Sequence, residues 1–296
     1  LDLAHLLDEE SRNKIKTILR RQAMNQLKQR SVFAETARLL KENQVPFIPI
    51  KGITLLNSVY SNPALRPMLD IDLLVKPEDT ERITRLMKEQ GARQHTGLQS
   101  EYLDSFVQHI PPFNWKNTLI EFHTSFFGKT DPYSLSTELA WKESRSTISF
   151  NQKIQTLSPE TELVYISLHA YKHLFRKSFK LVWLNDVVLY LNKMEFNPDK
   201  ALSLLQNDAD KKAFYSMMGL AASLKQALIP PQFTKSIKKN WTEEALQALD
   251  EHLQNQKNSP GEAVFIDLGK LNTKEKLQYI NAILFPSAAF MKKKYK

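Results

Sequence analysis

Two aspartates stand inside an otherwise apolar stretch, Met-Leu-Asp-Ile-Asp-Leu-Leu-Val, at residues 68–75. Short apolar runs of this length are typical of buried strands. Residues two apart on a strand share a face, so Asp70 and Asp72 point the same way while their apolar neighbours face the core. Because an unpaired buried carboxylate is costly, two of them predict a cation at this place.

A third carboxylate lies on a second predicted strand, Leu-Ile-Glu-Phe-His at residues 119–123. Its alternation puts Glu121 and His123 on one face and the apolar residues on the other. If this strand runs beside the first, Glu121 joins Asp70 and Asp72. Three clustered carboxylates suit Mg²⁺ or Mn²⁺, and such a cluster can hold a pair of ions at a triphosphate. An Asp-x-Asp pair alone is more often a solvated strand face, and the apolar flanks weigh against that alternative.

A Lys-Gly pair separates a predicted strand at 45–50 from a predicted short helix at 53–60. A strand, a Gly turn and a helix N-terminus present backbone N–H groups to an anion. Lys51, Gly52 and the hydroxyl of Thr54 are therefore candidate nucleotide-binding groups. Arg66 either reaches a phosphate or pairs with an aspartate. The pattern is neither a P-loop nor a Gly-x-Gly-x-x-Gly loop.

These motifs resemble the DNA polymerase beta-like nucleotidyltransferase superfamily. Within it, they are similar to the branch called the uncharacterised nucleotidyltransferase family, which resembles the abortive-infection type nucleotidyltransferase toxins. The superfamily usually has Gly-Ser where this chain has Lys51-Gly52. The resemblance covers roughly residues 45–191, including a His-x3-His helix followed by Leu-x-Trp-Leu-x-Asp.

The resemblance implies roles for individual residues. Asp70, Asp72 and Glu121 would bind metal, and Glu121 would also be the general base for an acceptor hydroxyl. Lys51 and Gly52 would contact the triphosphate.

The His-x3-His segment puts His169 and His173 on one helix face. A zinc protease site would need a Glu after the first His, and that residue is Ala170. Lys172 and His173 are candidate nucleotide-binding residues on a basic lip. The alternative is that the histidines are structural, hydrogen-bonded contacts between helices, with Asp186 as a partner.

The pattern of elements predicts an α+β fold with three parts. Residues 1–45 form N-terminal helices, 46–150 a small mixed-sheet nucleotidyltransferase core, and 151–296 an all-helical C-terminal domain. Helical periodicity recurs over 159–176, 179–194, 198–207, 209–228, 242–256 and 273–285.

Composition limits the remaining possibilities. The 296 residues include no Cys, which excludes disulfides and Cys-ligated zinc. A formal net charge of +9 favours anionic partners. No run of 18 apolar residues predicts a membrane span, and no basic-then-apolar segment opens the chain, so we expect a cytoplasmic protein.

We therefore expect a Mg²⁺- or Mn²⁺-dependent enzyme that moves a nucleoside monophosphate from ATP or another NTP to a hydroxyl or phosphate acceptor and releases pyrophosphate. The acceptor stays open, and RNA is one candidate. The alternative is a non-catalytic nucleotide-binding or scaffold protein with the same fold. The sequence does not give the oligomeric state.

Overall fold

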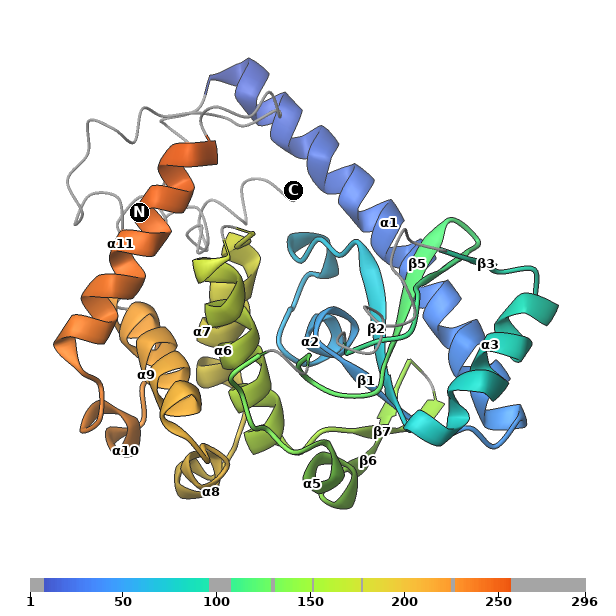
Figure 1. The fold of residues 1–296 in the computed structure, drawn as a ribbon. Coiled ribbons are helices and arrows are strands. Elements are labelled where there is room, and N and C mark those ends of the chain that lie inside the picture. Colours follow the sequence, from blue (N-terminus) through green and yellow to red (C-terminus); the bar gives the residue numbers. More distant parts are fainter. Residues whose placement is uncertain are drawn as a thin grey trace. The chain divides into compact units, whose positions relative to one another are not determined.

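The structure is a computed structural model of the 296-residue chain. It describes residues 8–95, 108–128, 131–150, 152–176, 178–224 and 227–256. The chain divides into two compact units. Residues 21–166 and 194–211 form one, here the sheet unit, and the described residues within 8–20, 167–193 and 212–256 belong to the other, here the helical unit; Figure 1 labels their helices and strands.

Five strands form the mixed sheet of the sheet unit, in the order β1-β2-β5-β4-β3. Strand β1 (Phe47–Ile50) is antiparallel to β2 (Asp70–Val75), which is parallel to β5 (Thr118–His123). Strands β4 (Phe113–Trp115) and β3 (Arg93–Gln94) complete the sheet by antiparallel pairing. This mixed sheet, together with the helices described below, confirms the predicted α+β fold class.

Helix α1 (Glu9–Glu42) is one continuous helix of 34 residues. Residues 1–7 of the predicted N-terminal helices lie outside the described residues. Helices α2 (Gly52–Ser58) and α3 (Thr80–Glu89) follow β1 and β2, each accompanied by a short 3₁₀ turn at Pro63–Leu65 or Pro77–Asp79. The apolar face of β2 shares one buried core with α1 and α3, which includes Ile71, Leu73, Val75, Phe33, Leu40, Ile83 and Met87.

The hairpin between β4 and β5 turns at Lys116 and Asn117. Both residues have positive φ, at 51° and 54°. Two central residues with positive φ are typical of the tight turn whose twist matches a hairpin. Strand β4 begins at Phe113, directly after Pro111 and Pro112. Proline has no N–H to donate to a ladder, which accounts for the start of the strand at this residue.

A second hairpin, β6 (Arg145–Ser149) with β7 (Gln152–Thr156), was not predicted from the sequence. Its residues are mostly polar and exposed, and Ile154 is the buried exception. Strand β7 lies inside the range 151–296 that was expected to be helical. The helical C-terminal part of the chain therefore begins at α6 (Pro159–Phe175) and not at residue 151.

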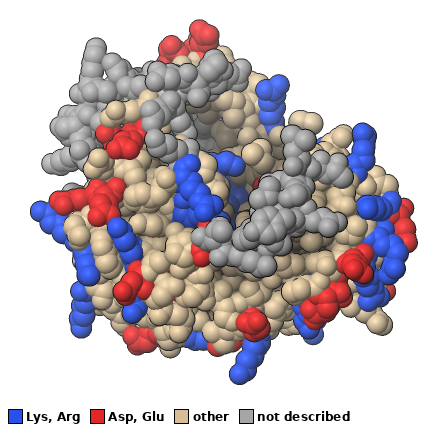
Figure 2. All heavy atoms as spheres, in the orientation of Figure 1, with Lys and Arg blue, Asp and Glu red and all other residues tan. Residues whose placement is uncertain are grey.

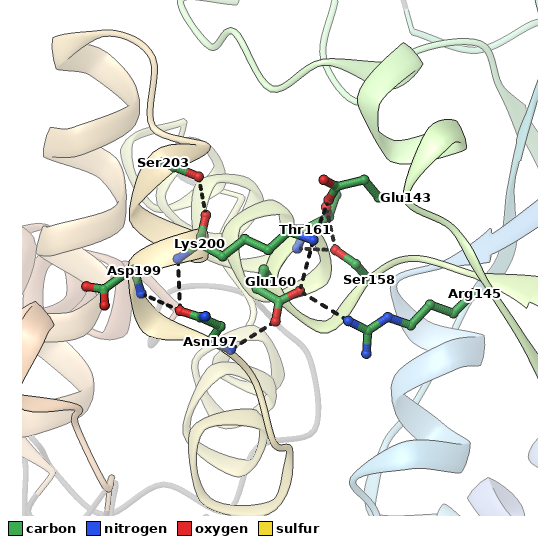
Figure 3. Close-up of polar contacts among 9 residues, drawn as sticks. All are labelled: Glu143, Arg145, Ser158, Glu160, Thr161, Asn197, Asp199, Lys200 and Ser203. Atoms are coloured by element: carbon green, nitrogen blue, oxygen red, sulfur yellow. Dashed lines mark hydrogen bonds and ion pairs between the residues drawn. The ribbon is translucent and has the colours of Figure 1, made fainter.

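The first turn of α6 is fixed by its cap and by the buried carboxylate of Glu160 (Figure 3). The hydroxyl of Ser158 accepts a hydrogen bond from the backbone N–H of Thr161 at 3.2 Å, which satisfies one open donor of the helix. Glu160 Oε1 accepts one from the backbone N–H of Asn197 at 2.9 Å. Because Asn197 directly precedes α8 (Pro198–Ser203), this bond ties α8 to α6.

Two cations face the other side of the same carboxylate. Arg145 and Lys200 lie 3.8 and 3.9 Å from Glu160 Oε2 (Figure 3). Lys200 also pairs with Glu143, just after α5 (Thr137–Lys142), at 2.9 Å. The network therefore joins the segments 143–161 and 197–200 of the sheet unit, and we interpret it as structural.

The helical unit contains α7 (Leu181–Lys193), α10 (Pro231–Thr234), α11 (Lys239–Gln256) and parts of α1, α6 and α9 (Asp208–Ser223). Aromatic pairs fill its interior, such as Phe214 with Phe233 at 5.1 Å between ring centroids. Among the described residues, no helix is long and apolar enough to cross a membrane. The predicted helix at 273–285 lies outside the described residues.

Candidate active site

The parallel pairing of β2 with β5 sets Asp72 directly opposite Glu121. Residues opposite each other on paired strands put their side chains on the same face of the sheet. The neighbouring residues Ile71 and Leu73 point to the other face and are fully buried in the core. The strand that carries Glu121 therefore runs beside the strand that carries Asp72, as the alternation of both segments predicts.

His123 joins these two carboxylates. One ligand atom from each of Asp72, Glu121 and His123 lies within 4.8 Å of the others, and among the described residues this is the group that could hold a metal ion. His123 Nε2 lies 2.7 Å from Asp72 Oδ1 and 3.4 Å from Glu121 Oε2. Asp70, which pairs with Leu119, is not a member of this group.

Lys51 pairs with one of the two aspartates. Its Nζ lies 2.8 Å from Asp72 Oδ1, so the lysine expected at a triphosphate contacts a carboxylate that was expected to bind a metal ion. Its backbone has φ 55° and ψ −125°, in a region that favours glycine. A non-glycine residue held there carries backbone strain, which is often retained at functional sites.

The charges of this site stabilise one another. Burial alone would raise the pKa of Asp72, but the ammonium of Lys51 and the hydrogen bond from His123 hold it well below its ordinary value. Burial disfavours the charged form of Lys51, but Asp72 outweighs it and the pKa of Lys51 is raised. The pKa of Glu121 is lowered although burial opposes this, mainly because the imidazole of His123 lies beside it, with Nε2 3.4 Å from Oε2. Both carboxylates are therefore ionised at neutral pH.

Gly52 lies where no side chain fits. A Cβ atom at this position would lie 2.6 Å from Arg66 Nη1 and 2.7 Å from Met68 Sδ. Arg66 itself is buried, and its backbone carbonyl accepts a hydrogen bond from Gln26 Nε2 on α1 at 2.5 Å. The structure thus brings two predicted nucleotide-binding residues, Gly52 and Arg66, into contact.

We expect Gly52→Ala to destabilise the protein by about 1 to 3 kcal/mol, because the new methyl group overpacks a filled site. Urea unfolding followed by circular dichroism measures this loss. Gly91→Ala is the matched control, because Gly91 has a φ of +76° and open space around its Cβ position. Its cost should come from the backbone alone, about 1 kcal/mol. Equal stability of wild type and the Gly52 variant would show that Arg66 and Met68 move aside.

Thr54 lies on α2, three residues after Lys51. Its hydroxyl oxygen is buried and has no hydrogen-bond partner among the described residues. A buried hydroxyl without a partner is unusual, which is compatible with the predicted contact to a ligand.

Lys172 and His173 lie on α6 within the helical unit. His173 Nδ1 is 2.7 Å from the hydroxyl of Ser178, and its ring packs on Trp183 at 4.6 Å between centroids. His169 contacts the same two rings, at 4.6 Å from His173 and 5.0 Å from Trp183. These contacts match the structural alternative for the histidine pair.

Sequence reasoning left two residues of the site without a role. His123 is two residues after Glu121 on the same strand face, so the alternation of β5 carried the signal. Tyr165 on α6 is fully buried and close enough for Lys51 to affect it. Burial raises the pKa of Tyr165, and the nearby ammonium of Lys51 opposes that rise. No motif marks this tyrosine.

A family model described as uncharacterised nucleotidyltransferase matches residues 1–226. The chain belongs to this family. As a member of the uncharacterised nucleotidyltransferase family it is a transferase, and the match includes Lys51, Asp72, Glu121 and His123. No curated protein matches the sequence at a significant level.

Solved structures with similar chains are also nucleotidyltransferases or resemble them. ANT(2″)-Ia, in a complex with adenylyl-2″-tobramycin, has 10% sequence identity and a TM-score of 0.44 over 60% of this chain and 94% of its own. An antigenic nucleotidyltransferase-like protein from Paracoccidioides brasiliensis has 16% identity and a TM-score of 0.44 over 68% of this chain and 94% of its own. The family assignment depends on the family model and not on these distant likenesses.

Proposed function

We propose that this nucleotidyltransferase moves a nucleoside monophosphate from an NTP to a hydroxyl or phosphate acceptor, with release of pyrophosphate and with Mg²⁺ or Mn²⁺ as cofactor. The observation that carries the proposal is the pairing of Asp72 with Glu121 on adjacent parallel strands, next to Lys51. The family assignment supports the reaction class.

The donor set fits a divalent cation. Asp72 and Glu121 offer oxygen ligands of the kind that Mg²⁺ and Mn²⁺ prefer, and their ligand atoms lie within 4.8 Å of each other. Asp70 is a further candidate ligand because it shares a strand face with Asp72. A bound divalent cation would neutralise charge on the triphosphate and favour ionisation of the attacking oxygen.

The residues of the chain would activate the acceptor and hold the triphosphate. The acceptor oxygen attacks the α-phosphorus, and the bond from that phosphorus to the bridging oxygen breaks, so that pyrophosphate leaves with the electron pair. Glu121 is ionised and takes the proton of an acceptor hydroxyl. Lys51, Gly52, Thr54 and Arg66 would hold the triphosphate, and Lys172 and His173 remain candidates for nucleotide contacts.

Among the residues coloured in Figure 2, Lys and Arg side chains lie interspersed with Asp and Glu side chains. RNA is one candidate acceptor, because the chain has a formal net charge of +9.

The test is transfer of label from each of the four NTPs, labelled at the α-phosphate, to total tRNA and to the protein itself with Mg²⁺ present. We expect labelling with wild type and loss of labelling with Asp72→Ala, because this carboxylate is the central ligand of the proposed site. Calorimetry with NTP and Mg²⁺ measures binding when the acceptor is of another class.

Glu78→Ala is the matched control, because Glu78 is an exposed acid that follows the same strand. It should label as wild type does. Asp70→Ala separates the two aspartates, since Asp70 lies outside the group of close ligand atoms. Retention of NTP-dependent labelling and of metal-dependent NTP binding by Asp72→Ala would refute the proposed site.

A further inference from the structure

His123 is fully buried in the candidate site, at 0% exposure. Its Nε2 is 2.7 Å from Asp72 Oδ1, and the Nζ of Lys51 lies 3.4 Å from the same nitrogen. Its Nδ1 is buried and has no hydrogen-bond partner among the described residues. The two ring nitrogens therefore have different surroundings, which decides where the proton sits.

The hydrogen-bond network assigns the ring proton to Nε2. A contact of 2.7 Å between Nε2 and an ionised carboxylate oxygen needs a proton between them, because two acceptors at this distance would repel. Protonation of Nδ1 would instead place a buried N–H beside no described acceptor. A nitrogen that carries a proton has no lone pair for a metal ion.

A histidine that binds a metal usually donates its other N–H to a carboxylate or carbonyl, which fixes the ring. If Nε2 were the ligand, the other nitrogen would be Nδ1, and no described group accepts a hydrogen bond from it. If Nδ1 were the ligand, the ion would lie on the far side of the ring from Asp72 Oδ1, which Nε2 contacts, and so apart from the proposed site. The position of His123 among the close ligand atoms therefore does not make it a ligand.

Both described donors at Asp72 use one oxygen. Lys51 Nζ and His123 Nε2 both contact Oδ1, and no donor among the described residues hydrogen-bonds Oδ2. His123 Nε2 also lies 3.4 Å from Glu121 Oε2, so one imidazole spans the two carboxylates. A carboxylate held by one oxygen presents the other in a fixed direction.

We propose that His123 is a positioning residue that holds Asp72 by Oδ1, so that Oδ2 binds the divalent cation, and that His123 itself does not bind the metal. This rests on the proposed function, because it assumes a divalent cation at Asp72 and Glu121. In this proposal the carboxylate oxygens of Asp72 and Glu121 bind the metal ion, and the Nε2 nitrogen of His123 orients Asp72.

Two substitutions and the metal alone test this inference. His123→Gln keeps an N–H donor at about the reach of Nε2, whereas His123→Phe keeps a ring without a donor. Electron paramagnetic resonance follows Mn²⁺ binding without nucleotide, and its pulsed form detects coupling of Mn²⁺ to a ligand nitrogen. We expect no directly bound nitrogen in wild type, near wild-type affinity for the Gln variant, and affinity about 10- to 100-fold weaker for the Phe variant.

Two results would overturn the inference about His123. Coupling to a bound nitrogen in wild type that both variants lose would make His123 a ligand and overturn the inference, as would wild-type affinity in a folded Phe variant. If the Phe variant does not fold, the nitrogen signal of wild type and the affinity of the Gln variant still decide. Asp72→Ala with undiminished Mn²⁺ affinity would refute the proposed site, a result distinct from any failure of the role of His123.

Discussion

Lys51→Met should destabilise the folded protein by about 3 to 5 kcal/mol, because it removes one partner of a buried ion pair and leaves the other charged. The side chains of Lys51 and Asp72 are 16% and 4% exposed, so water does not replace the lost ammonium. Met keeps the length and apolar stem of Lys, which limits the change to the charge. Urea unfolding at neutral pH measures the difference.

A matched control removes a lysine from an exposed pair. Lys116 pairs with Glu35, and these side chains are 49% and 33% exposed. Lys116→Met should cost less than about 1 kcal/mol. Equal losses for the two variants would mean that burial does not strengthen the pair of Lys51 with Asp72. Because a divalent cation can take the place of the lost ammonium, Mn²⁺ should raise the unfolding temperature of the Lys51 variant more than that of wild type.

Asp210→Ala should cost about 3 kcal/mol or more, because one fully buried carboxylate serves several donors. Its Oδ1 accepts from the backbone N–H of Ser134 at 3.1 Å, and its Oδ2 accepts from the hydroxyl of Ser134. The backbone N–H groups of Gln206 and Asn207 also donate to Oδ2, at 3.1 and 3.4 Å. The substitution leaves these donors without their acceptor.

Thermal unfolding followed by circular dichroism measures this effect. Asp210→Asn keeps an oxygen acceptor and should lose less stability than the Ala variant. Asp199→Ala is the surface control, because Asp199 is exposed in the first turn of α8, and its change should stay within about 0.5 kcal/mol. An Ala variant as stable as the Asp199 control would show that water satisfies the donors around residue 210.

The sequence was informative where strand alternation carries the signal. The period of two in β2 and β5 predicted that Ile71, Leu73, Ile120 and Phe122 face the core and that Glu121 lies beside the aspartate strand, because polar and apolar residues alternate over residues 70–73 and 120–123. The hairpin of β6 and β7 was not predicted, because its segment has one buried apolar residue, Ile154, and therefore no alternation of apolar and polar residues.

Contacts that depend on tertiary distance could not be predicted in the same way. The pairing of Lys51 with Asp72 joins residues 21 apart in the sequence, and His123 lies 51 residues from its carboxylate partner. The sequence pattern predicted a triphosphate contact for Lys51 and a metal ion for Asp72, and it predicted no role for His123. Only the register of β2 against β5 and the unusual backbone of Lys51 bring them to a single oxygen.

The division of the chain into two units has a consequence for making fragments of this protein. The backbone passes from one unit to the other at residues 20/21, 166/167, 193/194 and 211/212, and three of these positions lie inside the continuous helices α1, α6 and α9. A gene fragment spanning residues 46–150 would carry Lys51, Asp72 and Glu121 but would omit Glu160, Lys200 and Asp210. A single pair of truncation points therefore cannot isolate the sheet unit, because its two stretches, 21–166 and 194–211, are separated by a stretch of the helical unit.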